Sequence, residues 1–383
     1  MTKPMLKDEI ASAEALAPLL ADIRARRKEF EQQGYISQDI IERFRSLGVY
    51  RALVAKRFGG TEMDPASFCK LIETISTADG SAGWVASFGI GAVYLSSLPV
   101  ETLEKLYADG PDPIFAGGIF PPQPAPRVEG GLKVTGRWSW SSGCMGADVI
   151  GVGIMPQGGL GKELPRMAVM PRAKAQIVPN WDVSGLQGTG SHDLVVDGVV
   201  VPEEWTFVRG GGSSLETPLY RYPALSFATQ VLAVVALGLA RGAIDELVHM
   251  ATGRTSATGA PNIGDRVYVQ LEIAKCEADL RGARAFFYEA IDTVWSVLLA
   301  DGQPTAEEIS LLRLSATHAA RVGADVARRI QMLTGMTGVY ESSPIAAQVR
   351  DAQMVTQHAF VGEITYQNAG AILFGKDPLP GYL

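Results

Sequence analysis

The stretch from Gly136 to Asp148 reads Gly-Arg-Trp-Ser-Trp-Ser-Ser-Gly-Cys-Met-Gly-Ala-Asp. Tryptophan alternates with serine along it, which predicts a β-strand with Trp138 and Trp140 on one face and serines on the other. The strand runs into a tight turn of small and hydroxyl-bearing residues. An aromatic wall beside such a turn suits a flat conjugated ligand such as a flavin. An ordinary strand with an aromatic core face explains the same pattern.

The composition describes a globular chain with a large core. It has 383 residues, of which 47% are hydrophobic and 20% charged, and a net charge of −7. The acidic balance and the lack of a basic block argue against a nucleic-acid partner. Three widely spaced cysteines indicate neither a disulfide framework nor a zinc site. The N-terminus has no apolar signal segment, and the longest apolar run, Val231 to Ala240, is too short to span a membrane, so we expect a cytoplasmic protein.

The hydrophobic periodicity of the sequence changes twice along the chain. Helical periodicity prevails to about residue 109, short alternating runs separated by Pro and Gly follow, and the period returns to 3.6 after Pro223. Arg209–Ser214, with three consecutive glycines, is typical of a flexible link. The predicted fold is α+β: a helical domain (1–113), an antiparallel β domain (114–212) and a four-helix bundle (213–383) with helices at about 224–252, 265–300, 305–333 and 345–374.

Trp140 to Asp148 resembles, in register, the Trp-Ile-Thr-Asn-Gly-x-x-Ala-Asp element that lies against the flavin in acyl-CoA dehydrogenases. The resemblance puts Ser142 at the threonine that hydrogen-bonds flavin N5 in that family, with Trp140, Ser141 and Gly143 beside the cofactor. The Gly-x-Trp-x-Trp-x-Ser-Gly form is similar to that of the oxygenase components of two-component flavin monooxygenases. Members of that branch act on p-hydroxyphenylacetate, dibenzothiophene, secosteroid phenols and indoles.

Further elements of the same family occur in the same order along nearly the whole chain. Leu47–Tyr50 with Phe58–Gly60 resembles elements of the family's N-terminal domain. Gly185–Ser191 followed by Val200–Glu203 resembles its Gly-Met-x-x-Thr-x-Ser and Val-Pro-Glu elements. Arg350–His358 resembles the start of its last long helix. The resemblance therefore implies the order of domains that the periodicity predicts, and a homotetramer packed through its bundles.

His358 is the most informative titratable residue. Its spacing from Arg350, Met354 and Val361 predicts a position near an apolar face of the last helix, where it is either a satisfied core histidine or a functional group. In aromatic hydroxylases of the resembled fold, a histidine of this helix faces the oxygen-reactive edge of the flavin. Other branches add a second histidine, at a position held here by Val355 or by one of residues 91–93. Because this chain lacks such a second histidine, we expect an indole-like or other neutral bicyclic aromatic substrate.

Other residues complete the predicted site. The resemblance brings Arg254, near the end of the first bundle helix, to the flavin phosphates, and compensation of the helix dipole is the alternative role. Aromatic side chains are expected to wall the substrate pocket, each with a place in the core as its alternative: Trp84, Phe88, Phe115 and Trp138. We hypothesise that reduced FMN or FAD reacts with O2 through a C4a-hydroperoxide. Ser142 would then donate to N5, and His358 would stabilise or protonate the peroxide and orient the substrate.

Competing chemistries lack their motifs. Glu246 and His249 have the spacing of half a di-iron site, but no second pair exists, so no metal is expected and a helix-surface pair is the plainer interpretation. No Gly-x-Ser-x-Gly elbow occurs, and His192 beside Asp193 is not a triad. Without a pyridine-nucleotide motif, a separate NAD(P)H:flavin reductase must supply reduced flavin. The alternatives are an acyl-CoA dehydrogenase, disfavoured because the tail 371–383 has no glutamate base, and a non-catalytic protein of the same fold.

Overall fold

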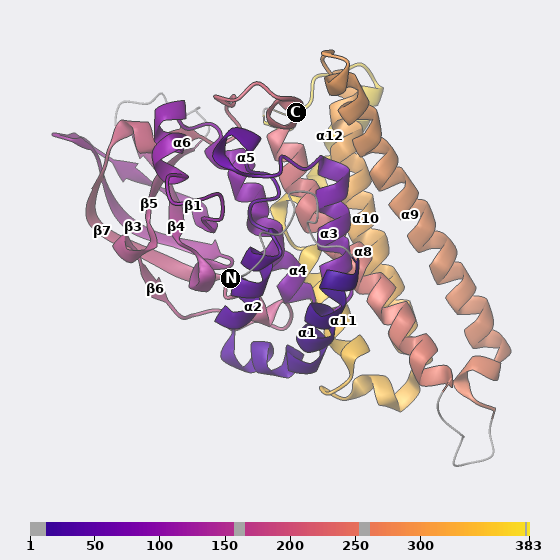
Figure 1. Ribbon diagram of the computed structural model, residues 1–383. Helices are drawn as coiled ribbons and strands as arrows, with labels where there is room; N and C mark the ends of the chain where they lie inside the picture. The colour runs from indigo at the N-terminus through magenta and orange to yellow at the C-terminus, as the bar shows by residue number, and fades with distance from the viewer. Residues whose placement is uncertain (1–12, 157–164, 253–260, 380) are drawn as a thin grey trace.

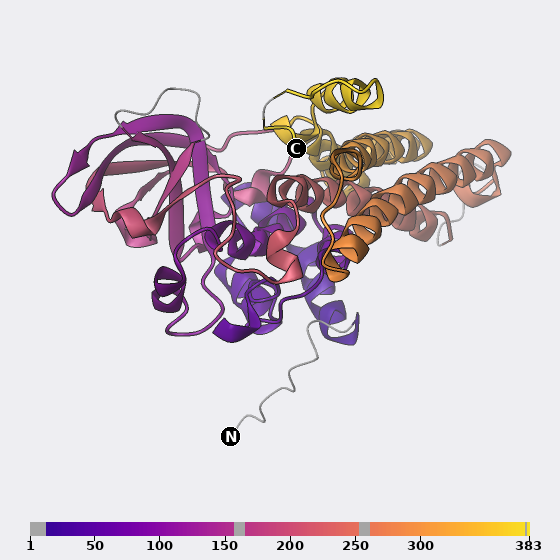
Figure 2. The same ribbon diagram turned by 90° about the horizontal axis from the view of Figure 1, so that it is seen from above.

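The computed structural model describes residues 13–156, 165–252, 261–379 and 381–383. Figures 1 and 2 show strands gathered at one side of the molecule, the N-terminal helices in the middle, and long C-terminal helices on the opposite side. All the strands of the described residues lie between residues 115 and 208. The predicted α+β fold, with helical regions flanking a β-sheet region, is confirmed.

The N-terminal region is built from α-helices, two of which begin at an aspartate cap. Its α-helices are α1 (Ala13–Gln33), α2 (Gln38–Ser46), α3 (Pro65–Ser76), α4 (Gly80–Ala86), α5 (Gly91–Leu95) and α6 (Val100–Leu106). Asp64 and Asp79 cap α3 and α4 by accepting the N–H groups of Ser67 and Ala82, each at 2.8 Å. Asp79 thus fixes where α4, the helix that carries Trp84, begins.

The β region is two four-stranded sheets packed face to face. The strands are β1 (Phe115–Ala125), β2 (Arg127–Val128), β3 (Gly131–Ser141), β4 (Val149–Pro156), β5 (Arg166–Pro171), β6 (Gln176–Val178), β7 (His192–Val201) and β8 (Thr206–Val208). One sheet has the order β1-β4-β5-β8 and the other β2-β3-β7-β6. Among the described strands, β1 and β4 pair in parallel and the other pairs are antiparallel. Alternate inward-facing residues of both sheets, such as Val134, Ile150 and Leu194, form a core of their own.

The C-terminal region is a bundle whose last segment is broken. Its helices are α7 (Pro218–Arg221), α8 (Ala224–Thr252), α9 (Val267–Leu299), α10 (Ala306–Leu333), α11 (Pro344–Val355) and α12 (Ile364–Leu373). The first three predicted bundle helices agree with α8, α9 and α10 to within two residues at each end. The predicted helix 345–374 is instead α11, a short 3₁₀ turn at Ala359–Val361, and α12. His358 therefore lies in a connection rather than on a helix face.

Helix α8 is the centre of the molecule. The apolar run Val231–Ala240 is buried all round, since α3 packs on one side of it and α10 on another. Glycines allow the close approach: a Cβ at Gly238 would lie 2.3 Å from the Glu73 carbonyl oxygen, and one at Gly323 would lie 2.5 Å from that of Ala236. The most apolar part of the sequence is therefore a core helix, and within the described residues no helix is long and apolar enough to cross a membrane.

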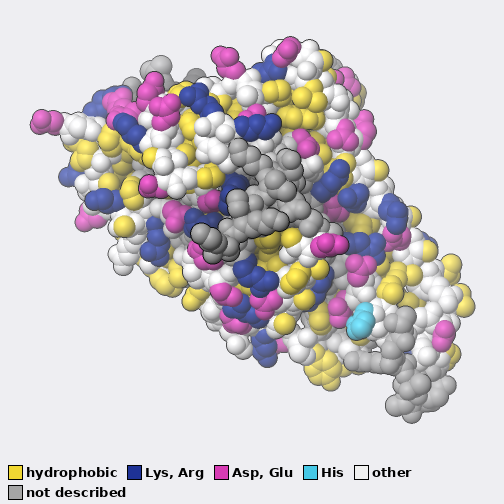
Figure 3. Space-filling model, viewed as in Figure 1, with side chains coloured by type: hydrophobic (Ala, Val, Ile, Leu, Met, Phe, Trp, Pro, Cys, Tyr) yellow, Lys and Arg dark blue, Asp and Glu magenta, His cyan; other side chains and the backbone are white. Residues whose placement is uncertain are grey.

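The surface carries charges of both signs. On the face shown in Figure 3, Lys and Arg side chains are interspersed with Asp and Glu rather than gathered into one field. Many are paired, as Arg329 is with Glu272 and Asp279 at 2.6 and 2.7 Å.

Candidate functional site

Three segments from distant parts of the chain meet at a row of buried hydroxyl groups. Trp84 of α4 donates its Nε1–H to Ser142 Oγ, in the turn after β3, at 3.1 Å. Ser142 Oγ lies 2.6 Å from Ser191 Oγ, which lies 2.7 Å from Thr189 Oγ1. Thr189 Oγ1 donates to the carbonyl oxygen of Leu186 at 2.8 Å. Trp84 and the three hydroxyl-bearing residues are each less than a tenth exposed.

The chemistry of the hydroxyl gives this row a direction. The Thr189 hydroxyl has one proton, and the Leu186 carbonyl takes it, so Thr189 must accept from Ser191. Ser191 then has no proton left and must accept from Ser142. Ser142 donates its proton along the row and uses one lone pair for Trp84. Its second lone pair remains, so Ser142 meets a ligand as an acceptor, whereas the sequence analysis expected a donor.

The strand before this turn does not keep its two indoles on one face, so that prediction was wrong. Trp138 is fully buried in the β core and donates its Nε1–H to the Gly153 carbonyl at 2.7 Å, whereas Trp140 is 66% exposed. The reason is a β-bulge: the register of β3 on β7 shifts between Trp138 and Ser141, and Trp140 has a left-handed φ of 62°. The bulge turns Trp140 outward and Ser141 inward. Ser141 Oγ is buried without a hydrogen-bond partner.

The loop that supplies Thr189 and Ser191 is held by α11. Leu186 adopts a left-handed φ of 52°, and its N–H donates to Asp351 Oδ1 at 2.6 Å. At Gly185 a Cβ would lie 2.4 Å from the carbonyl oxygen of Arg350, so glycine is required there. The row of hydroxyls therefore ends on a carbonyl whose position is fixed from the bundle.

Two buried carboxyls lie behind that anchor. Burial raises the pKa of Asp351, and the neighbouring Asp79 raises it further, because two adjacent negative charges are costly away from water. Burial also raises the pKa of Asp79, while the guanidinium of Arg27 opposes the rise. Arg27 itself donates to the Ala78 carbonyl at 2.5 Å. We therefore place the shared negative charge on Asp79, beside Arg27, and a proton on Asp351.

His358 faces the same tryptophan from the bundle side. Its ring lies edge-on to Trp84, with centroids 5.8 Å apart, and against Phe360 at 4.9 Å. His358 Nδ1 accepts the backbone N–H of Phe360 at 3.2 Å and so caps the short turn that follows α11. The predicted helix is interrupted here: α11 ends at Val355, and the imidazole begins the next turn as its cap. Ser142 and His358, the two predicted catalytic residues, thus both contact the indole of Trp84.

The environment keeps His358 uncharged. Burial lowers its pKa to about 4, and the positive charge of Arg209 lowers it further. The neutral ring accepts at Nδ1, so its proton is on Nε2 and is available to a ligand. Among the described residues, no carboxylate contributes to this pKa. His358 can therefore hold or orient a group by donating a hydrogen bond, and it is not a cationic acid at neutral pH.

The remaining predicted residues have varied positions. Phe115 is buried between α5 and the β region, where Cβ atoms at Gly91 and Gly151 would touch its side chain. Phe88 is partly buried and packs on the main core. Gly143, with a left-handed φ of 72°, donates to the Thr189 carbonyl at 2.8 Å and so joins the turn to the neighbouring loop. Arg254 lies outside the described residues.

The other histidines that the sequence singled out are differently engaged. His192 Nδ1 accepts the N–H groups of Asn180 and Trp181 at 3.1 and 3.2 Å, so it organises a loop. His249 is engaged in an interaction of its own. Within the part of the chain that the structure describes, no group of three His, Cys, Asp or Glu residues could hold a metal ion.

Sequence reasoning missed several residues of this region. Gly185–Ser191 was matched as a family element, but nothing in it indicated that Thr189 and Ser191 extend the Ser142 hydrogen bond. Arg209 was placed in a flexible link. In the structure its guanidinium lies 4.0 Å from the ring centroid of Tyr94 in α5. Its local sequence, an arginine before three glycines, carries no signal of that contact.

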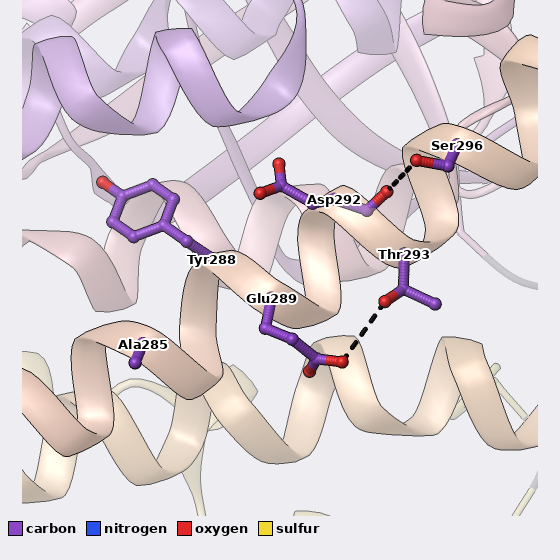
Figure 4. Close-up of a pocket in the computed structure, with 6 residues that line it drawn as sticks. All are labelled: Ala285, Tyr288, Glu289, Asp292, Thr293 and Ser296. Carbon is purple, nitrogen blue, oxygen red and sulfur yellow. Dashed lines mark hydrogen bonds between the residues drawn. The ribbon is translucent and has the colours of Figure 1, made fainter.

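A separate hollow on the outer surface of the bundle has a different character. Figure 4 shows that its residues all come from α9, among them Glu289, Asp292 and Thr293. Their polar groups are satisfied locally, as in the 3.3 Å hydrogen bond from Thr293 Oγ1 to Glu289 Oε1. Groups from different elements do not converge there, so we place the functional site at Trp84.

Helices flanking a β region, with a hydroxyl-rich turn beside the second tryptophan of a Trp-x-Trp strand, define the acyl-CoA dehydrogenase class of flavoprotein. Two family models agree: the acyl-CoA dehydrogenase N-terminal domain matches residues 9–99 and the C-terminal domain residues 230–363. The chain belongs to the acyl-CoA dehydrogenase family, and its 60% and 53% identical relatives place it among the flavin-dependent monooxygenases of this fold.

Individual relatives sharpen that assignment. The chain is 60% identical to indole-3-acetate monooxygenase of Pseudomonas putida, over 98% of this chain and 97% of that one. It is 53% identical to indole-3-acetate monooxygenase of Acinetobacter baumannii, again over 98% and 97%. XiaF from Streptomyces sp., solved in complex with FADH2 and glycerol, has the same fold, with a TM-score of 0.91, 20% identity and 98% of each chain covered.

Proposed function

We propose that this chain is the oxygenase component of a two-component flavin-dependent monooxygenase that hydroxylates indole-3-acetate. The observation that carries the proposal is the 60% identity, over almost the whole of both chains, to an indole-3-acetate monooxygenase. The site agrees with it, because Trp84 and His358 offer an aromatic edge and a neutral hydrogen-bond donor to a bicyclic substrate. Membership of the family itself makes the chain a flavin-dependent hydroxylase of aromatic or indole substrates.

The residues around the β3 turn fit a reduced flavin. Ser141 Oγ is buried and unpartnered, and Trp140 presents an exposed indole next to it. Ser142 keeps a free lone pair, which suits the N5–H of a reduced flavin better than the bare N5 of an oxidised one. Bound reduced flavin supplies the two electrons with which one oxygen atom of O2 enters the substrate and the other leaves as water. Of the two flavins, FMN and FAD, we propose FAD, because XiaF was solved in complex with FADH2.

The protein's own part is to position, and to keep water out. Trp84, His358 and the hydroxyl row are held by buried hydrogen bonds, so they need no rearrangement when the reaction begins. His358 Nε2–H stabilises negative charge that develops on oxygen near it, without giving up its proton. An acyl-CoA dehydrogenase needs a carboxylate base instead, and the tail 371–383, where the resembled family carries it, has no glutamate.

The wider setting follows from the same class. A separate NAD(P)H:flavin reductase supplies the reduced flavin, and the three unpaired cysteines suit a reducing compartment such as the cytoplasm. We propose a homotetramer, because apolar side chains more than half exposed gather at the start of α9 and after α10: Val267, Tyr268, Leu271, Met332, Met336, Val339 and Tyr340. Analytical ultracentrifugation measures that state directly.

The function is tested with isotopically labelled O2. The purified protein is mixed with enzymatically reduced FAD or FMN, labelled O2 and indole-3-acetate, and the products are weighed by mass spectrometry while hydrogen peroxide is assayed. We expect one labelled oxygen atom in the product and little free peroxide. Oxidation of the reduced flavin by O2 with an equal amount of hydrogen peroxide released, and with indole-3-acetate unchanged, would overturn the proposal.

A further inference from the structure

Arg209 is a cation whose Nε lies buried without a hydrogen-bond partner. Its guanidinium lies over the ring of Tyr94, and no carboxylate among the residues that the structure describes pairs with it. Three other arginines with a buried, unpartnered Nε each bind a carboxylate through another nitrogen: Arg45, Arg221 and Arg321. Arg172 and Arg313 also lack a carboxylate, but each has another engagement. The charge of Arg172 acts on the Cys144 thiol of the β core, and Arg313 donates to the Tyr382 carbonyl at 2.9 Å. Among the described residues, Arg209 has the face of Tyr94 as its support and no such acceptor.

Arg209 reaches the neighbourhood of His358 from the side of α5. Tyr94, which the guanidinium covers, is in α5, and only one short 3₁₀ turn, Ser87–Ile90, separates α5 from the helix of Trp84. The charge of Arg209 is close enough to act on His358, where it is the second cause of the lowered pKa. Ser142 therefore contacts Trp84 from the turn after β3, whereas Arg209 acts on His358 from the segment after β8.

The backbone around Arg209 is fixed, although its three glycines predicted a flexible link. The Arg209 N–H donates to the Pro165 carbonyl at 3.0 Å. A few residues later, the Ser214 N–H donates to the Ser96 carbonyl at 2.7 Å, and Ser213 Oγ donates to Ser96 Oγ at 2.8 Å. Both contacts tie the segment to the end of α5. The guanidinium is therefore presented from an ordered support, which reduces the entropy that binding an anion costs.

A partly buried cation without an anion is costly, and the face of Tyr94 offsets only part of that cost. The planar guanidinium matches a carboxylate through two parallel N–H···O bonds. We propose that Arg209, supported by Tyr94, binds the carboxylate of an arylacetate substrate and so places its aromatic ring against Trp84 and His358. This assignment rests on the proposed function, since it takes the substrate to be a carboxylate. It adds the residue that distinguishes indole-3-acetate from neutral indoles.

The test compares a charged ligand with its neutral analogue. Indole-3-acetate and indole-3-acetamide have nearly the same shape, and only the first carries a charge. Affinities are measured anaerobically with reduced flavin bound, followed by KM and kcat, for the wild type, Arg209→Gln and Arg209→Lys. Arg57→Gln is the matched control, because Arg57 is exposed and pairs with Glu104 far from the site.

We expect Arg209→Gln to raise the Kd and KM for indole-3-acetate on the order of 10- to 100-fold, the loss of a charge-assisted hydrogen-bond pair. The same variant should leave the Kd and KM for indole-3-acetamide within about twofold of the wild-type values. Its kcat with saturating indole-3-acetate should change less than its KM. Arg209→Lys should recover part of the affinity for indole-3-acetate, because lysine keeps the positive charge but lacks the two parallel N–H donors of the guanidinium. Arg57→Gln should match the wild type.

Three results separate the possible failures. Equal weakening of the acetate and the amide would make Arg209 a structural residue and overturn the assignment. A loss of affinity for reduced flavin, with acetate binding intact, would assign the anion to the flavin phosphate and overturn it as well. If the wild type binds arylacetates with the expected Arg209 dependence but never hydroxylates indole-3-acetate, the proposed function fails and the carboxylate site stands.

Discussion

Two regions flank the Trp84–His358 pair, and they are built on opposite principles. On the β side, Trp84, Ser142, Ser191 and Thr189 form an uncharged row in which each donor has an acceptor. On the other side, Arg209 is charged and its Nε has no partner. A row that is complete without a ligand is suited to hold a shape, whereas an unpaired cation is suited to select a ligand by charge.

This difference separates two requirements of a two-component hydroxylase. The flavin arrives by diffusion from another protein and must meet a site that is already formed, which the hydroxyl row provides. The substrate must be recognised among many aromatic molecules, and a guanidinium supplies that discrimination because a site built for a charged group rejects the analogue that lacks it. His358 lies between the two and contacts one region through Trp84 while its pKa responds to the other.

Beside the Arg209 variants, the largest effect is expected from breaking the hydroxyl row. Ser142→Ala removes the acceptor of the Trp84 N–H and the donor to Ser191, and leaves a buried N–H unpaired. Coupling is the amount of hydroxylated product formed per reduced flavin consumed. We expect coupling to fall on the order of tenfold in this variant, with a matching rise in free hydrogen peroxide. The reason is that one lost hydrogen bond with a stranded donor costs about 1–3 kcal/mol. Product and peroxide are measured in the same reaction.

The control for Ser142→Ala is Ser310→Ala. Ser310 is equally buried, but its hydroxyl contacts Tyr382 at 3.3 Å in the bundle. A loss of coupling in both variants would indicate a general effect of buried serines. Unchanged coupling in Ser142→Ala would remove the hydroxyl row from the function.

A double variant sharpens the comparison between the two regions. If Ser142 acts on the flavin and Arg209 on the substrate, Ser142→Ala and Arg209→Gln should affect kcat/KM for indole-3-acetate independently. We expect the two losses, expressed as free energies, to add to within about 0.5 kcal/mol. A coupling energy well above that value would mean that the two regions act as one unit through Trp84 and His358.

Much of the fold was open to prediction from sequence, because it rests on periodicity over long segments. Helix α8 was predicted with its observed bounds, and the change from helix to strand near residue 114 agrees with the start of β1. The prediction of the α+β fold was confirmed. Strands and helices of this length are set by patterns that one residue cannot overturn.

The site was less predictable, because single residues break those patterns. Trp138 and Trp140 alternate in sequence, yet one left-handed residue in a bulge sends them to opposite environments. Helical spacing continues through His358, yet α11 ends at Val355 and the imidazole caps the short turn that follows. Arg209 acquires its role from Tyr94, 115 residues earlier, and no local pattern records such a contact. Where chemistry depends on long-range contacts of one side chain, the sequence indicates candidates and the fold decides among them.

A smaller effect, on pH dependence, tests the position of His358 between the two regions. Because its pKa is lowered to about 4, His358 is neutral near pH 7, and coupling should stay flat between about pH 6 and pH 9 as far as this group is concerned. A folded pKa below the unfolded value of about 6.5 means that the unfolded chain binds the extra proton first. Stability therefore falls as the pH drops below about 6.5, and coupling is lost as it nears 4.

The measurement is a pH profile of coupling beside the NMR titration of His358, identified by its absence in His358→Gln. Arg209→Gln should raise the His358 pKa, since it removes a neighbouring positive charge. A wild-type profile that bends near pH 6.5 together with the His358 resonance would contradict the neutral donor. His358→Phe, which keeps the ring contact with Trp84 and loses the donor, should lower coupling at every pH.

The smallest effect concerns the anchor behind the hydroxyl row. The raised pKa of Asp351 means that the folded protein holds a proton that the unfolded chain releases, so this carboxyl costs stability increasingly as the pH rises above the ordinary carboxyl range. Asp351→Asn removes the titratable group and keeps an oxygen for the Leu186 N–H. We expect the thermal midpoint of the wild type to fall more than that of the variant between about pH 5 and pH 8, by on the order of 2 °C. Asp245→Asn is the control, because Asp245 forms a surface ion pair with Arg241. If the thermal midpoints of the wild type and Asp351→Asn change in parallel with pH, Asp351 is ionised in the folded protein and the anchor is an ordinary carboxylate.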